Sequence, residues 1–314
     1  KQGIKENLAD FIFYLPCDSS TNAHKWLDYI NPHMAIFVKY DFWFHYINGL
    51  SKRHIPFIYI SAIFRTDQFF FKWFGGAFLK ELKKASRFFV QNDTSLNILN
   101  NKGITQVEVS GDTRFDRVIQ LPELEFTDEK IESFSVGERI IVAGSTWPED
   151  HKLLAGYCNS EEIKLLLVPH EIHESSYKDF TYACRKNVVR HSKATKEELK
   201  KADVLIIDKI GMLSKIYRFA TITYIGGGFG KGIHNTLEAA VYGKPVIFGP
   251  NFQKFAEAKL LIESGGAFTI NNLTEMKTVF DDLLNNNKKR EQAGAICENV
   301  VKSNSGATMI ITNW

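Results

Sequence analysis

The clearest chemistry in this sequence belongs to a glycine-rich turn at residues 226–232, GGGFGKG, which follows an apolar run ending at Ile225. Glycine adopts backbone conformations closed to other residues and lets backbone N–H groups approach a ligand. A helix expected to begin near His234 would aim its free N–H groups and its dipole at the same space. Lys231 would add a positive charge. The turn therefore predicts an anion site built on Gly226, Gly227, Gly228, Lys231, Gly232 and His234.

Two polar residues follow the turn. Asn235 and Glu238 are three residues apart, so we expect them on one face of the helix. A carboxylate in this position can accept two hydrogen bonds from a ribose diol, as in dinucleotide-binding folds. The alternative is a tight turn followed by a surface glutamate. The turn lacks the G-x-x-x-x-G-K-[ST] pattern, which disfavours a P-loop.

The elements that position these residues alternate between apolar runs and amphipathic stretches, which is typical of parallel strands joined by crossover helices. Strands are expected at 11–15, 34–39, 57–61, 87–91, 107–110, 140–144, 164–168, 188–190, 204–208, 221–225, 245–248 and 267–270. In the first part of the chain, helices are expected near 21–30, 42–53, 68–85 and 93–102.

Residues 121–138 are acidic and lack a strong apolar period, which predicts a linker. We therefore expect a first domain at 1–122, a linker at 123–138 and a second domain at 139–314. Both are predicted to be α/β, doubly wound parallel sheets of the Rossmann-like kind, facing a cleft that binds a ligand. The first is expected to lack one or two βα units, because it is the shorter and opens just before a strand.

Composition fits a folded two-domain chain. The 314 residues are 44% hydrophobic and 24% charged, and the net charge of +3 gives no reason to expect a nucleic-acid partner. The four cysteines form no C-x-x-C pair and no cluster with metal spacing, so we expect free thiols and no metal. No apolar run approaches the roughly 20 residues of a membrane span.

Several segments, taken in order, resemble the 3-deoxy-D-manno-octulosonic acid (Kdo) transferases, a family of GT-B glycosyltransferases. The segment GGGFGKGIHNTLEAAVYGKPVIFGP at 226–250 is similar to the family's donor-site signature. Residues 143–146, AGST, match a turn of its second domain, and SGDTRFD at 110–116 resembles its G-N-x-K-F-D element. Residues 168–170, VPH, stand where the family has V-P-R-H, and Asp208 with 211–213 stands where it has G-D-T-x-G-E-L. The resemblance covers essentially the whole chain.

The resemblance implies an inverting enzyme that transfers Kdo from CMP-Kdo to a lipid A precursor in lipopolysaccharide biosynthesis, with no metal and no other cofactor. It implies a peripheral protein at the cytoplasmic face of the bacterial inner membrane, with an anchor expected upstream of Lys1. Further donor contacts are expected from Ser145, Thr146, Pro169, His170, Gly211, Met212 and Leu213. Ser145 and Thr146 are equally suited to capping a helix ahead of Pro148.

Catalysis requires a carboxylate that removes a proton from the acceptor hydroxyl. The family's general base lies in an N-terminal glycine-rich segment that has no match here and would lie upstream of Lys1. A second family carboxylate, usually Glu, aligns with Asp41. A helix N-cap is the alternative role for Asp41. His170 stands where the family has Arg, and the family's N-A-R-L-S arginine is displaced to Arg65.

The expected acceptor is a phosphorylated glycolipid at a membrane surface. Residues 68–74, QFFFKWF, are strongly aromatic and are followed by several basic residues. Such a surface suits acyl chains and anionic headgroups, which makes Phe70, Lys72, Trp73 and Arg65 candidate acceptor or membrane contacts. The alternative is a buried crossover helix.

Two other functions compete with this one. The chain could be a GT-B enzyme that uses a UDP-sugar, such as a GlcNAc transferase or a 2-epimerase. It could also be a fragment that binds the donor without catalysing transfer. A dependence on uridine rather than cytidine would identify the first, and CMP binding without transfer would identify the second.

Overall fold

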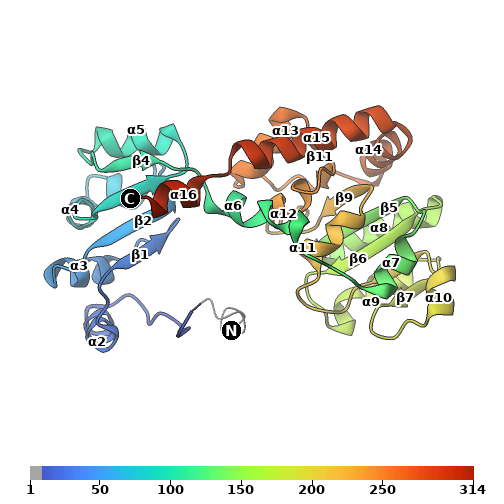
Figure 1. The fold of residues 1–314 in the computed structure, drawn as a ribbon, viewed down its shortest axis with the longest axis horizontal. Helices are drawn as coiled ribbons and strands as arrows, with labels where there is room; N and C mark the ends of the chain where they lie inside the picture. The colour runs from blue at the N-terminus through green and yellow to red at the C-terminus, as the bar shows by residue number, and fades with distance from the viewer. Residues whose placement is uncertain (1–8) are drawn as a thin grey trace. The chain divides into compact units, whose positions relative to one another are not determined.

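The computed structural model describes residues 9–314, which form two compact units. Unit 1 comprises Lys1–Thr113 and Gly306–Trp314, and unit 2 comprises Arg114–Ser305. Each unit is a parallel sheet with helices packed on it (Figure 1). Among the helices formed by residues 9–314, none combines the length and the apolar content needed to cross a bilayer.

Unit 1 contains four parallel strands in the order β1-β2-β3-β4. The strands are β1 (Ala35–Val38), β2 (Phe57–Ala62), β3 (Arg87–Val90) and β4 (Val107–Val109). The helices are α2 (Ser20–Ile30), α3 (Phe44–Lys52), α4 (Gly76–Leu82), α5 (Asp93–Asn101) and α16 (Ala307–Thr312). An aromatic core that includes Tyr59, Phe64 and Phe88 fills the space between sheet and helices. The last helix of the chain thus belongs to the first unit.

Unit 2 contains seven parallel strands in the order β11-β10-β9-β5-β6-β8-β7. The strands are β5 (Ile140–Thr146), β6 (Lys164–Pro169), β7 (Val188–Arg190), β8 (Val204–Ile206), β9 (Ile222–Ile225), β10 (Val246–Phe248) and β11 (Ala267–Thr269). The strand order reverses between β5 and β9. In an open α/β sheet, ligands bind at the carboxyl ends of the strands at such a reversal.

Helices cover both faces of this sheet, and each face has its own apolar cluster. The helices are α6 (Thr113–Ile119), α7 (Glu129–Ser135), α8 (Pro148–Ser160), α9 (Glu174–Ala183), α10 (Lys196–Lys201), α11 (Leu213–Ile216), α12 (Leu237–Ala240), α13 (Ala256–Ser264), α14 (Leu273–Asn285) and α15 (Asn287–Ser303). Short 3-10 turns occur at η1 (Phe69–Phe71), η2 (Leu121–Glu123) and η3 (Tyr217–Phe219).

The α/β class and the two parallel sheets predicted from the sequence are confirmed. Three local expectations are corrected. Residues 11–15 form no strand. The helix expected at 68–85 is divided into η1 and α4, because the chain turns at Gly75, where a Cβ atom would lie 2.4 Å from the carbonyl oxygen of Phe69.

The third difference concerns residues 123–138, which were expected to be a linker. They contain helix α7, whose Ile131 and Phe134 are fully buried in one core cluster of unit 2. Asp128 caps this helix by accepting hydrogen bonds from the backbone N–H groups of Lys130 and Ile131. The division between the units therefore falls at Thr113/Arg114, earlier in the chain than the expected boundary after 122.

Candidate functional site

The carboxyl ends of β5, β6 and β9 bring together the predicted donor residues of unit 2. Gly226 follows β9, and its N–H donates to the carbonyl oxygen of Gly144 on β5 at 2.9 Å. His170 follows β6, and its N–H donates to the carbonyl oxygen of Thr146 at 3.0 Å. Residues far apart in the sequence thus meet at the sheet edge where the strand order reverses.

Three positions of the turn require glycine, two because the backbone of another segment lies close and one because of its backbone conformation. A Cβ atom on Gly226 would lie 2.4 Å from the carbonyl oxygen of Ser145, and one on Gly228 would lie 2.6 Å from the backbone N of Gly249. Gly227 has a φ of +89°, a conformation that side chains disfavour. The turn is packed directly against β5 and against the loop after β10.

A buried carboxylate holds this arrangement together, and the sequence analysis did not identify it. Asp150 is fully buried and accepts hydrogen bonds from the Tyr224 hydroxyl at 2.6 Å, the Gly227 N–H at 2.9 Å and the Trp147 N–H at 2.8 Å. Burial raises the pKa of Asp150, and these three hydrogen bonds offset part of that rise. Its position as the third residue of α8, a favoured capping position, was the available signal.

Three aromatic rings stack beside the turn. The Trp147 indole N–H donates to Nε2 of His234 at 3.0 Å, and the planes of the two rings are nearly parallel, with an interplanar angle of 10°. The His170 ring stacks on both, with centroids 4.6 Å from Trp147 and 4.3 Å from His234. Burial, and then the neighbouring His170, lower the pKa of His234. The hydrogen bond and the lowered pKa both favour a neutral His234 ring.

Asn235 and Glu238 lie together as the sequence predicted, since the Asn235 amide donates to Glu238 Oε1 at 3.0 Å. Burial raises the pKa of Glu238, while hydrogen bonding from Asn235 and the charge of Arg117 oppose that rise. The expected helix start is corrected, because α12 begins at Leu237 rather than near His234. Asn235 therefore precedes the helix, and its side chain accepts from the Leu237 N–H at 3.2 Å.

The remaining predicted donor residues border the same sheet edge in different ways. Ser145 has a φ of +53° where the β5–β6 register shifts, and its hydroxyl makes no hydrogen bond within residues 9–314. Thr146 is buried, and its hydroxyl pairs with His151 Nε2 at 2.9 Å. Pro169 is buried at the end of β6.

Residues 211–213 reach β5 through a side chain. The side chain of Leu213 packs against Gly144, because a Cβ atom added to Gly144 would lie 2.7 Å from Cδ1 of Leu213. The side chain of Met212 is buried in the core of unit 2, so only its backbone is available to a ligand. Gly211 is exposed and has a φ of +84°. These residues precede α11, which has only four residues.

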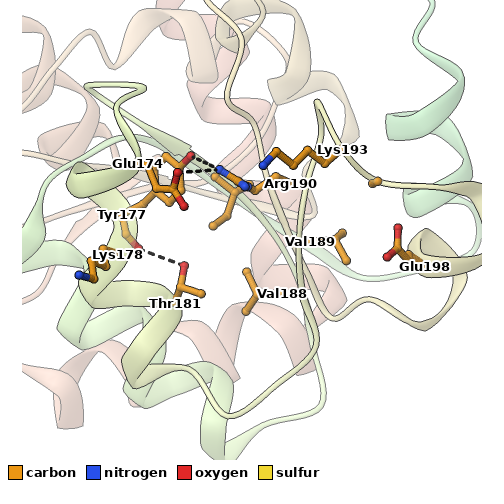
Figure 2. Close-up of a pocket in the computed structure, with 11 residues that line it drawn as sticks. Glu174, Tyr177, Lys178, Thr181, Val188, Val189, Arg190, Lys193 and Glu198 are labelled. Carbon is orange, nitrogen blue, oxygen red and sulfur yellow. Dashed lines mark hydrogen bonds and ion pairs between the residues drawn. The ribbon is translucent and has the colours of Figure 1, made fainter.

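The turn and two of the stacked rings border a cavity of about 380 Å³, lined by Trp147, Glu149, Gly227, Gly230, Lys231, Gly232 and His234. A second cavity lies between α9, β7 and the chain after it, and contains none of the predicted site residues. Figure 2 shows Arg190 paired with Glu174, 3.4 Å away, and Lys178, Lys193 and Glu198 drawn without a partner among the residues shown. Arg190 also donates to the Tyr177 hydroxyl at 3.3 Å. We therefore place the candidate site at the first cavity.

In unit 1, the predicted catalytic residue Asp41 is exposed after β1, and its carboxylate makes no hydrogen bond within the described residues. It is not a helix N-cap, because α3 begins at Phe44 and its N-cap is Trp43. Asp18 accepts the hydrogen bond from the His45 N–H in the first turn of that helix. The charge nearest to Asp41 in the sequence, Lys39, is paired with buried Asp112 at 3.1 Å.

The predicted acceptor contacts divide into exposed and buried residues. Lys72 is exposed, and Trp73 is 94% exposed. Arg65 is exposed beside Asp67 and lies 5.5 Å from the centroid of the Tyr40 ring. The prediction for Phe70 is corrected: its side chain is 1% exposed, because it packs against Phe42, Phe71 and Phe78 in the core.

Metal chemistry is not indicated by any cluster of side chains: within residues 9–314, no group of three or more His, Cys, Asp or Glu residues could hold a metal ion. The expected absence of a metal therefore stays a prediction.

Comparison with known proteins identifies relatives. A family model described as 3-deoxy-D-manno-octulosonic-acid transferase (kdotransferase) matches residues 1–117. The 3-deoxy-D-manno-octulosonic acid transferase of Rickettsia typhi is 27% identical over 287 residues, 87% of this chain and 60% of the relative. The enzyme of that name from Haemophilus influenzae is 25% identical over 97% of this chain and 74% of the relative. The chain thus spans about three fifths of the length of the Rickettsia protein.

Solved structures resemble the fold. UDP-GlcNAc 2-epimerase from Neisseria meningitidis, bound to UDP-GlcNAc, has a TM-score of 0.65 and 17% sequence identity, over 97% of this chain and 84% of that chain. At this identity the likeness concerns the fold alone. Together with the two parallel sheets, it confirms the GT-B class predicted from the sequence.

Proposed function

We propose, on the premise that this chain belongs to the Kdo transferase family, that it transfers Kdo from CMP-Kdo to a lipid A precursor of the lipid IVA type. The observation that carries the proposal is the edge of the seven-stranded sheet. There Asn235 and Glu238, the glycine turn and a 380 Å³ cavity lie together at the strand reversal. This is where α/β sheets bind nucleotides.

The parts of the donor have candidate partners at this edge. The Glu238 carboxylate is suited to the ribose hydroxyls, because Asn235 holds one of its oxygens and orients the group. The Ser145 hydroxyl has no hydrogen-bond partner among residues 9–314 and offers a hydrogen bond to the phosphate. Preorganised donors of this kind stabilise the charge that develops on a departing phosphate.

The proposed reaction is a single displacement. An acceptor hydroxyl attacks the anomeric carbon of Kdo as the bond from that carbon to the CMP phosphate oxygen breaks. CMP leaves with the electron pair, and the hydroxyl proton passes to a carboxylate. Asp41 is our candidate for that carboxylate, because it is exposed at the carboxyl end of β1 and its oxygens are not occupied by hydrogen bonds from residues 9–314. The proposed reaction uses no metal and no cofactor.

The acceptor side of the proposal is a membrane surface. Four exposed residues of the segment 72–80 combine basic and aromatic side chains: Lys72, Trp73, Phe74 and Lys80. Exposed aromatic rings beside basic side chains suit the interface of an anionic bilayer. We propose that unit 1 binds the cytoplasmic face of the bacterial inner membrane through this segment.

Ligand-dependent thermal stability tests the donor. We expect CMP to raise the melting temperature of the 314-residue chain and UDP to leave it unchanged, because a ligand that binds only the native state stabilises it. Stabilisation by UDP alone would favour the UDP-sugar enzymes considered above. CMP binding without transfer of Kdo to a lipid acceptor would favour a donor-binding fragment.

A further inference from the structure

The cavity beside the glycine turn has the properties of a ligand pocket rather than a gap in packing. Its volume of about 380 Å³ lies within the roughly 300–1,000 Å³ range of small-molecule sites. The Trp147 indole forms part of its wall, and one face of that ring is already covered by His170. Such a wall suits the apolar C–H groups of a sugar ring.

The backbone of the turn is largely committed to its own structure. The N–H of Gly226 donates to Gly144, that of Gly227 donates to Asp150, and those of Gly230 and Gly232 both donate to the carbonyl oxygen of Gly227. These four N–H groups are therefore unavailable to a ligand in the cavity. A charged side chain of the turn could still bind an anion there.

Lys231 provides that charge. It is exposed, and it is the one lysine or arginine among the residues that line the cavity. The other basic side chain in the lining, His234, is held neutral by the indole hydrogen bond described above. Glu149 lies in the same lining and supplies the opposite charge.

The ribose-binding carboxylate lies outside this cavity. Glu238 is absent from the residues that line the cavity. Gly232, at the other end of the turn, lies against the Phe255 ring and the Asn251 carbonyl. A donor whose ribose is at Glu238 would therefore extend a different part of its structure into the cavity.

We infer that the cavity is the subsite for the acidic sugar of the donor, with the Lys231 ammonium paired to the sugar carboxylate and Trp147 packed against its ring. The inference rests on the proposed function, since the sugar named for the family is an octulosonic acid and carries a carboxylate. Lys231 is then the residue that distinguishes an acidic sugar from a neutral one. Glu149 opposes an anion and limits how tightly the donor is held.

Binding measurements on the 314-residue chain separate the sugar from the nucleotide. Dissociation constants for CMP and for CMP-Kdo are measured for the native sequence and for Lys231→Met, which removes the charge while keeping the length of the side chain. A lost charge-assisted hydrogen bond weakens binding by about tenfold or more. We expect that loss for CMP-Kdo and less than a twofold change for CMP. Lys231→Arg keeps the charge and should restore most of the affinity for CMP-Kdo.

Glu149→Gln is the counterpart of Lys231→Met, because it should change the affinity for CMP-Kdo in the opposite direction. It removes the negative charge from the same lining, so we expect tighter binding of CMP-Kdo and unchanged binding of CMP. An equal loss of affinity for CMP and CMP-Kdo in Lys231→Met would assign Lys231 to the phosphate and overturn the inference. Unchanged affinities for both ligands would overturn it as well. If the native chain binds neither ligand, the proposed function itself fails, which is a different result.

Discussion

Each of the two sheets has a serine with a positive φ near its carboxyl edge, but the hydroxyl groups of the two serines differ in their partners. Ser61 at the end of β2 has a φ of +49°, Ser145 near the end of β5 has a φ of +53°, and each coincides with a shift in strand register. The Ser61 hydroxyl accepts from the Thr113 N–H at 3.0 Å and also pairs with the Thr113 hydroxyl. The Ser145 hydroxyl has no such partner within the described residues. The Ser61 hydroxyl thus joins β2 to Thr113, and the Ser145 hydroxyl is our candidate for a hydrogen bond to the donor phosphate.

The edges also differ in how their carboxylates are held. Asp150 of unit 2 is fully buried and accepts three hydrogen bonds, whereas Asp41 of unit 1 is exposed and accepts none from residues 9–314. A carboxylate fixed in this way shapes a site, and a carboxylate without protein partners can exchange a proton with a substrate. If unit 2 binds the donor and Asp41 acts on the acceptor, as we propose, the donor site is preformed and the reactive carboxylate faces solvent.

The largest expected effect comes from removing the buried carboxylate. Asp150→Ala leaves the Tyr224 hydroxyl and the N–H groups of Gly227 and Trp147 without their acceptor, which should cost about 4 kcal/mol of unfolding free energy. Asp41→Ala, at an exposed position, should cost less than about 0.5 kcal/mol. Urea denaturation measures both. Similar losses in the two variants would abolish the distinction between the edges.

Acid should weaken unit 2 through a buried histidine. Burial lowers the pKa of His151 to about 4, from 6.5. Between these pH values the unfolded chain binds the proton and the folded chain does not, so stability falls as the pH falls, by about 3 kcal/mol in total. His151→Gln should show a smaller loss between pH 6.5 and 4 in urea titrations at each pH. The matched variant His33→Gln, at an exposed position in unit 1, should retain the native pH dependence.

The glycine turn offers a sharper comparison within unit 2. Gly228→Ala would place a Cβ atom 2.6–2.9 Å from the backbone of Gly249, so we expect a loss of about 2 kcal/mol and weaker binding of CMP. Gly230→Ala meets its nearest atom at 3.8 Å and should be tolerated. Melting temperatures with and without CMP measure both effects. A tolerated Gly228→Ala would show that the turn has room to move.

The smallest effect on stability is expected in the exposed aromatic segment of unit 1. Trp73→Ser should change the unfolding free energy by less than about 0.5 kcal/mol, because the side chain is 94% exposed. The same variant should reduce binding to anionic lipid vesicles in a sedimentation assay. Phe70→Ala is the buried control, and it should destabilise the chain by about 3 kcal/mol. Undiminished vesicle binding by Trp73→Ser would contradict the membrane proposal for this segment.

Much of the fold could be predicted because its signals are local. Each of the strands of unit 2 was anticipated from a short apolar run, and the glycine turn from its composition. The contact between the Trp147 and His234 rings could not be predicted, because these residues are 87 positions apart and meet only when β5 and β9 become neighbours. Helix α7 was missed because just two of its residues, Ile131 and Phe134, are buried in an otherwise polar segment.

The position of α16 bears on the order in which the protein folds during synthesis. Residues 306–314 belong to unit 1, and the Trp314 ring packs 5.9 Å from the ring of fully buried Phe89 on β3. The ribosome makes these residues only after all of unit 2. Domains generally fold as units while the chain emerges. Unit 2 can therefore finish folding before unit 1, even though unit 1 supplies the first strand of the described chain.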